Sequence, residues 1–204
     1  MESLSKPTPD CYRSIAAPSK GLFKDKGSKF LSFSFPVTSE DQIKEIIASV
    51  KKEYFDAKHH CYAYRLGHLG DIFRANDDGE PSSTAGRPIL GQILSAELSD
   101  ILIVVVRYFG GILLGTSGLI AAYKGAAADA IANSFIVEKL ACQNWEIHFD
   151  YLQMNEVMTA LKELKVQPTD QVFDEKCSAT AQIRLSDTER FKELLKNVEI
   201  CQKA

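Results

Sequence analysis

The pattern of apolar and polar positions near the start of the chain predicts a strand followed by a helix. Residues 29–37 alternate between apolar and polar side chains, which is typical of a half-buried strand. Residues 39–55 place apolar side chains at helical spacing, and Ser39 suits the N-cap because its hydroxyl can accept a hydrogen bond from an unpaired backbone N–H. The apolar face of this helix consists of Ile43, Ile46, Ile47 and Val50.

Two further strands are expected in the interior of the same sheet. Residues 60–66 alternate but carry apolar side chains on both faces, and residues 101–106 form an unbroken run of Ile, Leu and Val. Such segments are typical of strands that are buried on both sides. The pattern also predicts a long polar loop over 67–86, a helix over 88–98, a small-residue helix over 116–133 and a returning strand over 135–142.

Glycine is absent beyond Gly125, and the last third of the chain follows a different pattern. A strand, a helix, two strands, a helix and a strand can be traced over 144–151, 156–164, 171–175, 179–185, 188–196 and 198–201. This order is typical of a small ferredoxin-like domain. We therefore expect an α+β protein with two domains, residues 1–141 and residues 142–204.

Composition restricts the class of protein further. The chain of 204 residues is 45% hydrophobic, which suits one generous core or two small ones. No run approaches the roughly 18–20 apolar residues of a membrane span, and the first residues lack the apolar stretch of a signal peptide. The five cysteines are widely spaced and form no C-x-x-C pair, so neither a disulfide framework nor a zinc ribbon is indicated. A cytoplasmic protein without a membrane partner is expected.

Charge argues against a nucleic-acid binder that works through its bulk charge. The formal net charge is −3, and residues 142–204 carry the excess acid, with 8 basic and 11 acidic side chains. Binding of a polyanion would therefore need a local basic patch. One candidate is the stretch with Lys20, Lys24, Lys26 and Lys29, which could equally be a solvated loop.

Ten of the 12 glycines lie between Gly67 and Gly125, and this clustering marks a site because glycine is favoured where something approaches the backbone closely. Within it, the stretch RYFGGILLGTSGL ends a strand at Arg107, turns at Gly110 and opens a helix at Gly115. Free N–H groups at a helix start favour an anion such as phosphate. The stretch matches neither the P-loop nor the dinucleotide-binding fingerprint, so P-loop hydrolysis is disfavoured. Tight packing of helix on sheet would explain the glycines equally well.

Three carboxylates occur within four residues, at Asp77, Asp78 and Glu80. Clustered oxygens suit Mg²⁺ or Ca²⁺, but the EF-hand spacing is missing and a turn before a helix explains these residues equally well. His59 and Cys61 share one face of a strand, yet no third group that would orient a catalytic pair is identifiable. The sequence therefore assigns no metal, no cofactor and no catalytic residue.

Four blocks of the sequence resemble the IMPACT family, which includes the bacterial YigZ-like proteins. They are KGSKF at 26–30, the pattern A-x-H-x-C-x-A-Y-R at 57–65, DDGEP and TAGRP within 77–88, and VVVRYFGGILLGTSGLIAAY at 104–123. The resemblance implies an amino-terminal domain with the fold of the second domain of ribosomal protein S5, and a ferredoxin-like carboxy-terminal domain. Both are similar to the last domains of elongation factor G, which contact the ribosome. No catalytic residues are implied.

The resemblance also implies a role in translation. Eukaryotic members of the family regulate translation under amino-acid stress by competing for a kinase activator, and nucleic acid or ribosomes are the ligands expected for bacterial members. This chain departs from the family pattern: Ser83 and Ser117 stand where glycine is common, and Ala121 stands where many bacterial relatives have a basic residue. The missing charge lowers the affinity expected for phosphates.

Our first hypothesis is therefore a non-enzymatic, translation-associated binding protein that engages RNA, the ribosome or another polyanion through one groove, with aromatic rings that stack on bases. One alternative is a protein–protein regulator of a stress response, which binds its partner through the acidic carboxy-terminal domain or the 77–80 loop. The other is a metal-dependent hydrolase with His59 as base; the motif itself leaves open the roles of His59, Cys61, Asp77, Asp78 and Glu80. The residues expected to bind the polyanion are Lys26, Lys29, Arg87, Arg107, Tyr108, Phe109, Gly110, Gly111, Gly115, Thr116 and Gly118.

Overall fold

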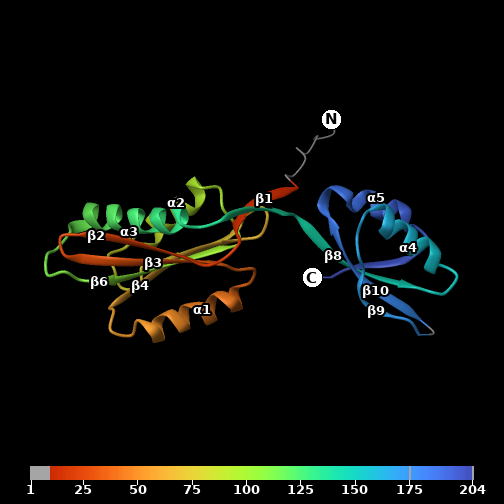
Figure 1. Ribbon diagram of the computed structural model, residues 1–204, viewed down its shortest axis with the longest axis horizontal. Coiled ribbons are helices and arrows are strands. Elements are labelled where there is room, and N and C mark those ends of the chain that lie inside the picture. Colours follow the sequence, from red (N-terminus) through yellow and green to blue (C-terminus); the bar gives the residue numbers. More distant parts are fainter. Residues whose placement is uncertain (1–9, 175, 204) are drawn as a thin grey trace. The chain divides into compact units, whose positions relative to one another are not determined.

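The computed structural model describes residues 10–174 and 176–203 (Figure 1). Their contacts divide them into two compact units, and each is described by itself. The amino-terminal unit comprises residues 12–139. The carboxy-terminal unit comprises residues 140–203 together with residues 10 and 11. The sequence predicts a boundary between residues 141 and 142. It does not predict that residues 10 and 11 belong to the carboxy-terminal unit.

The amino-terminal unit is built on one antiparallel sheet with the strand order β2-β3-β6-β4-β5. Helix α1 lies on one face of this sheet, and α2 and α3 lie on the other (Figure 1). Strands β1 (Cys11–Ile15) and β7 (Ile136–Leu140) form a separate pair. The sheet strands are β2 Ser19–Asp25, β3 Ser28–Pro36, β4 His59–Leu66, β5 Ile72–Asn76 and β6 Ile101–Tyr108, and the helices are α1 Glu40–Glu53, α2 Gly86–Ser95 and α3 Gly115–Ala132.

Strand β6 is the centre of the unit, as its unbroken apolar run predicts. All its residues from 101 to 106 are fully buried. Ile101, Ile103 and Val105 face the core beneath α2 and α3, whereas the alternate residues face the core beneath α1. The next two positions continue this alternation, so the side chains of Arg107 and Tyr108 leave the sheet on opposite faces.

Helix α1 begins as predicted. The hydroxyl of Ser39 accepts a hydrogen bond from the N–H of Gln42, and Ile43 and Val50 on its apolar face are buried. This N-cap satisfies one of the N–H groups that a helix start leaves without an intrahelical partner.

Two strands of the sheet are absent from the sequence prediction. The basic stretch around Lys20 and Lys24 is strand β2 rather than a loop, and the predicted polar loop 67–86 contains β5. Strand β2 lacks a clear apolar face because Gly21 lets α3 approach so closely that a Cβ there would lie 2.5 Å from the backbone nitrogen of Ala130. In β5, Ile72, Phe73 and Arg74 are all exposed, so no burial enforces an alternating pattern.

The carboxy-terminal unit has the predicted element order, strand, helix, two strands, helix, strand. Its sheet has the order β11-β8-β10-β9, and all paired strands are antiparallel. The predicted strand over 135–142 is in fact divided, since β7 ends at Leu140 and the next strand starts at Cys142. The elements are β8 Cys142–Phe149, α4 Met154–Glu163, β9 Thr169–Val172, β10 Cys177–Arg184, α5 Thr188–Leu194 and β11 Glu199–Gln202. Within 10–174 and 176–203, no helix is long and apolar enough to cross a membrane.

Candidate functional site

The sequence blocks at 26–30, 57–65 and 104–123 meet at one end of the amino-terminal sheet. Lys29 is the partner of Tyr108 in the β3–β6 ladder, and His59 is the partner of Arg107 in the β4–β6 ladder. The turn between β2 and β3 also touches the glycine turn after β6, since a Cβ on Gly110 would lie 1.9 Å from the carbonyl carbon of Gly27. The residues of this end therefore come from segments that are far apart in the chain.

Asp77 organises the loop that enters α2. Its carboxylate accepts hydrogen bonds from the backbone N–H groups of Ser83, Ala85 and Gly86 at 2.8–3.0 Å. Burial alone would raise the pKa of Asp77, but these hydrogen bonds outweigh burial and lower it. Ser83 has a φ of 65°, a left-handed conformation that favours glycine. Asp77 thus acts as a structural anchor of the loop.

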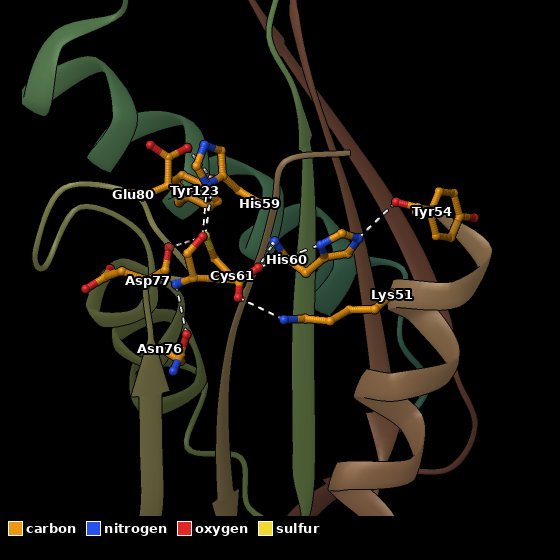
Figure 2. Close-up of polar contacts among 10 residues, drawn as sticks. Lys51, Tyr54, His59, His60, Cys61, Asn76, Asp77, Glu80 and Tyr123 are labelled. Atoms are coloured by element: carbon orange, nitrogen blue, oxygen red, sulfur yellow. Dashed lines mark hydrogen bonds and ion pairs between the residues drawn. The ribbon is translucent and has the colours of Figure 1, made fainter. Parts of the chain in front are cut away.

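Asp78 ties the loop to β4 and α1 instead. Its carboxylate accepts from Nζ of Lys51 at 2.8 Å and from the backbone N–H of His60 at 2.7 Å. Burial alone would raise the pKa of Asp78, but the hydrogen bonds from Lys51 and His60 lower it. In Figure 2 the ring of His60 points toward α1, where Nε2 donates to the carbonyl of Tyr54 at 3.0 Å. The ring of His59 donates from Nδ1 to the carbonyl of Asp78 at 2.9 Å.

Glu80 lies in a buried polar network on the α3 side of the sheet (Figure 2). It accepts from a guanidinium nitrogen of Arg107 at 2.6 Å and from the hydroxyl of Tyr123 at 2.8 Å. That hydroxyl also lies 3.3 Å from Sγ of Cys61. Burial raises the pKa of Tyr123 well above its ordinary value and raises the pKa of Cys61 to about 12. Both groups are therefore neutral at physiological pH.

These contacts argue against the two enzymatic arrangements that the sequence left open. The carboxylates of Asp77, Asp78 and Glu80 bind three different sets of partners, and in the described part of the chain no three His, Cys, Asp or Glu side chains are placed to hold a metal ion. Cys61 is a buried neutral thiol, whereas a cysteine nucleophile needs an accessible thiolate. The described contacts therefore give no support to the metal-dependent hydrolase with His59 as base.

A cavity of about 460 Å³ opens at the end of β6 beside this network. Arg107 lies in its wall with only 8% of its surface exposed. Its guanidinium centre lies 5.5 Å from the ring of Phe30 and 5.7 Å from the ring of Phe109. Glu80 is its only hydrogen-bond partner among the described residues, and Nε is buried without one. The cavity is lined by Asp56, Ala57, Lys58, His59, Arg107, Tyr108, Phe109 and Leu113.

The structure gathers only part of the predicted polyanion site around this cavity. Arg107, Tyr108 and Phe109 line it. Lys29 is exposed but lies on the sheet face opposite to Arg107, because its ladder partner is Tyr108. Lys29 and Arg107 therefore do not share one face of the sheet. The other predicted residues do not line the cavity, namely Lys26, Arg87, Gly110, Gly111, Gly115, Thr116 and Gly118.

Two of these residues have other observed positions. Lys26 is exposed in the turn between β2 and β3, next to Gly27, which touches the glycine turn. Arg87 lies in the first turn of α2, where its charge lowers the pKa of Asp77 after the larger effects of burial and backbone hydrogen bonds.

Sequence reasoning missed Lys58 and Leu113 as cavity residues. Lys58 precedes β4, between two residues of the block 57–65, and Leu113 lies in the loop between β6 and α3. The pairing of β4 with β6 brings Lys58 beside the end of β6, and that register cannot be read from either segment alone.

Comparison with known proteins gives the family. Residues 26–131 match the model of the Impact N-terminal domain, about half of the chain. The IMPACT family member YvyE of Bacillus subtilis (strain 168) is 33% identical over 166 residues, which cover 81% of this chain and 76% of YvyE. The IMPACT family member YigZ of Escherichia coli (strain K12) is 35% identical over 148 residues, which cover 72% of each chain.

A solved structure extends the similarity to both units. A crystal structure described as that of a hypothetical protein superposes with a TM-score of 0.74 at 26% identity, covering 96% of this chain and 98% of that one. The eukaryotic relatives match a smaller part: the Protein IMPACT homolog of Dictyostelium discoideum aligns with 45% of this chain and 27% of its own length. The family model and the two bacterial relatives, which align over most of both sequences, agree with one another, and the chain belongs to the IMPACT family.

Proposed function

We propose that this chain is a translation-associated regulatory protein that binds RNA through the end of its amino-terminal sheet and acts by binding rather than by catalysis. Membership of the family supports the link to translation, because that role is what the resemblance implies. A cytoplasmic location, where RNA and ribosomes are found, belongs to the same proposal.

We also propose that the two units have the folds of the second domain of ribosomal protein S5 and of a ferredoxin-like domain. The order strand-helix-strand-strand-helix-strand, with the sheet order β11-β8-β10-β9, supports the second assignment. Both assignments would relate the chain to the last domains of elongation factor G.

The observation that carries the RNA proposal is the position of Arg107. Its guanidinium is permanently charged, is nearly buried, and lines an open cavity with only one acceptor bound. A phosphate in the cavity would supply acceptors for the accessible guanidinium donors that Glu80 does not bind. Binding of an anionic ligand therefore explains the position of Arg107 beside a cavity better than a contribution to stability alone does.

Exposed lysines around the same end of the sheet would extend the contact along a polyanion. Lys24 and Lys29 are partners in the β2–β3 ladder, so they lie side by side on the face that also carries Tyr108. Lys26 lies in the turn between these strands, and Lys58 lies at the cavity. Among the described residues none of these four lysines forms an ion pair with a carboxylate. Their charges remain available for phosphates despite the net charge of −3.

The test is fluorescence anisotropy of labelled single-stranded and duplex RNA over a salt series. We expect affinity to fall steeply with salt, and Lys29→Ala and Lys58→Ala each to weaken binding and reduce the magnitude of the log–log salt slope by about 1. Lys44→Ala is the matched control, because it removes the same charge from the first turns of α1, the opposite end from the cavity. RNA binding that is independent of salt, or equal in all three variants, would overturn the proposal.

For a protein–protein regulator, the sequence offers two docking surfaces, the acidic carboxy-terminal domain and the 77–80 loop, and the contacts of the loop argue against the second. The three carboxylates of residues 77–80 are bound by groups of the same unit. A partner could not use these charges without breaking the contacts that order the loop.

A further inference from the structure

The cavity at the end of β6 has the size of a site for one small ligand rather than for a nucleic-acid duplex. Its volume of about 460 Å³ lies within the roughly 300–1,000 Å³ that is usual for small-molecule sites. Duplex RNA is bound across wide surfaces through its grooves and backbone, whereas single-stranded RNA offers bases that can be splayed out of the strand. A cavity of this size can receive one such base with its sugar and phosphate.

One side of the cavity is suited to the phosphate. Arg107 and Lys58 are the two cationic residues of the lining, and His59, which follows Lys58, is the ladder partner of Arg107. The lining contains one carboxylate, Asp56, which accepts a hydrogen bond from the hydroxyl of Tyr108 at 2.7 Å. Glu80 accepts a hydrogen bond from one nitrogen of the Arg107 guanidinium. It is therefore a positioning residue for the other N–H donors of that guanidinium. The lining has two cationic residues against one carboxylate, and an anion would bind to the guanidinium donors that Glu80 leaves free.

The other side of the cavity is apolar and suited to a base. The side chain of Phe109 lines the cavity and is 56% exposed, so its ring is accessible to a ligand in the cavity. Leu113, 84% exposed, and Ala57 extend this apolar surface. Tyr108 is less free to stack than the sequence predicts, because its hydroxyl is held by Asp56. Phe109 is therefore the stacking residue.

We infer that this cavity is a nucleotide site, in which a single unstacked nucleoside monophosphate unit places its phosphate against Arg107 and Lys58 and its base against Phe109. This inference rests on the proposed RNA binding, and it adds that one nucleotide of the strand is taken out of the stack. The same chemistry would accept a free mononucleotide, so the two sources of the ligand must be separated by experiment.

The experiment titrates adenosine monophosphate, ribose 5-phosphate and inorganic phosphate to millimolar concentration into the full chain and follows the amide resonances by NMR. We expect adenosine monophosphate to shift the signals of residues 57–59 and 107–113 and to bind more tightly than ribose 5-phosphate, because only the former carries a base. Phe109→Ala should weaken the binding of adenosine monophosphate by roughly 5- to 150-fold, which is the loss expected when the stacking of one base is removed. The same variant should leave the affinity for ribose 5-phosphate unchanged.

The matched control is Ile112→Ala. Ile112 lies in the same loop and is also 56% exposed, but it does not line the cavity, so its truncation should leave all three affinities unchanged. Equal affinity for adenosine monophosphate and ribose 5-phosphate, or no effect of Phe109→Ala, would overturn the inference.

Parallel RNA titrations distinguish failure of the inference from failure of the proposed function. If RNA binds with salt dependence but adenosine monophosphate neither binds nor competes, RNA binding stands and the nucleotide site is wrong. If adenosine monophosphate binds in the cavity and RNA does not, the nucleotide site stands, its source is the free nucleotide, and RNA binding is wrong. Binding of neither ligand overturns both.

Discussion

The guanidinium of Arg107 lies 2.6 Å from the carboxylate of Glu80, and the two side chains are only 8% and 3% exposed. The pair joins the end of β6 to the loop before α2, two segments that belong to different blocks of the family motif. The hydroxyl of Tyr123 donates to the same carboxylate oxygen at 2.8 Å, so α3 is tied to the pair as well. A buried ion pair thus connects three elements of the amino-terminal unit in the wall of the cavity.

Removing one member of the Arg107–Glu80 pair should lower the free energy of unfolding. Glu80→Ala leaves the charge of Arg107 buried without its counter-ion, and we expect the free energy of unfolding to fall by about 3–5 kcal/mol in urea denaturation. Arg107→Met should cost a similar amount by leaving Glu80 unpaired. The double variant Glu80→Leu/Arg107→Met should lose clearly less than the sum of the single losses, because no unpaired charge remains. Strictly additive losses would show that the two side chains do not interact.

The contact between the two glycine-containing turns gives a second prediction. A Cβ on Gly110 would lie 1.9 Å from the backbone of Gly27, whereas a Cβ on Gly91 in α2 would meet nothing within 4 Å. Gly110→Ala should therefore lower the free energy of unfolding by about 1–3 kcal/mol through overpacking. Gly91→Ala is the control, and it should raise the free energy of unfolding by about 0.5–1 kcal/mol because glycine is unfavourable in a helix interior. The same sign for both variants would contradict this account.

The elements with strong local signals could be predicted from sequence alone. The N-cap at Ser39 and the apolar run of β6 are signals that can be read from one short segment each. Strand β2 could not be predicted in this way. Its edge is satisfied by residues from α3, since the N–H of Leu22 donates to Asp129 at 2.8 Å. Besides its pairing with β3, this strand thus depends on a residue of α3 that lies 107 positions later in the chain.

The candidate site also combines features that one segment can predict with features that depend on distant contacts. Arg107, Tyr108 and Phe109 are consecutive, so their joint presence at the cavity could be predicted from one segment. That Arg107 is buried against Glu80, and that Lys29 points to the other face, depends on strand register and on a loop contact. Register between distant strands is set by the whole sheet, so the sequence could place these three residues together but not the lysines around them.

Thiol accessibility gives a third prediction. Cys11 and Cys201 are exposed, Cys142 is partly buried, and Cys61 and Cys177 are buried. Since burial raises the pKa of Cys61 to about 12, only about one in ten thousand of its side chains would be thiolate at pH 8. A thiol reagent at pH 8 should label Cys11 and Cys201 first in the native protein, and Cys61 only after unfolding in guanidinium chloride. Mass spectrometry of the labelled peptides checks the order, and rapid native labelling of Cys61 would contradict the buried network.

The anchoring role of Asp77 predicts how stability depends on pH. Its folded-state pKa lies below the ordinary value of about 3.9, because three backbone N–H groups stabilise the charged form more than burial opposes it. A group with a lowered pKa binds its proton more readily in the unfolded state. Its contribution is therefore complete above about pH 4 to 5 and is lost as the pH falls through the folded-state pKa. Asp77→Asn should lower the free energy of unfolding at pH 7 by about 1–3 kcal/mol, the usual loss for hydrogen bonds to a charged group.

The difference between the wild type and Asp77→Asn should then shrink as the pH falls from 5 toward 3, because protonation removes the same charge from the wild type. Urea denaturation over this range measures it. Other carboxylates, such as Asp78, also have a lowered pKa, so the wild type alone cannot isolate Asp77, whereas the difference between the two proteins does. Asp41→Asn is the control, since its carboxylate pairs with Lys44 at 2.7 Å on the exposed surface of α1, and it should change stability much less. A difference between wild type and Asp77→Asn that stays constant with pH would show that the charge of Asp77 does not hold the loop.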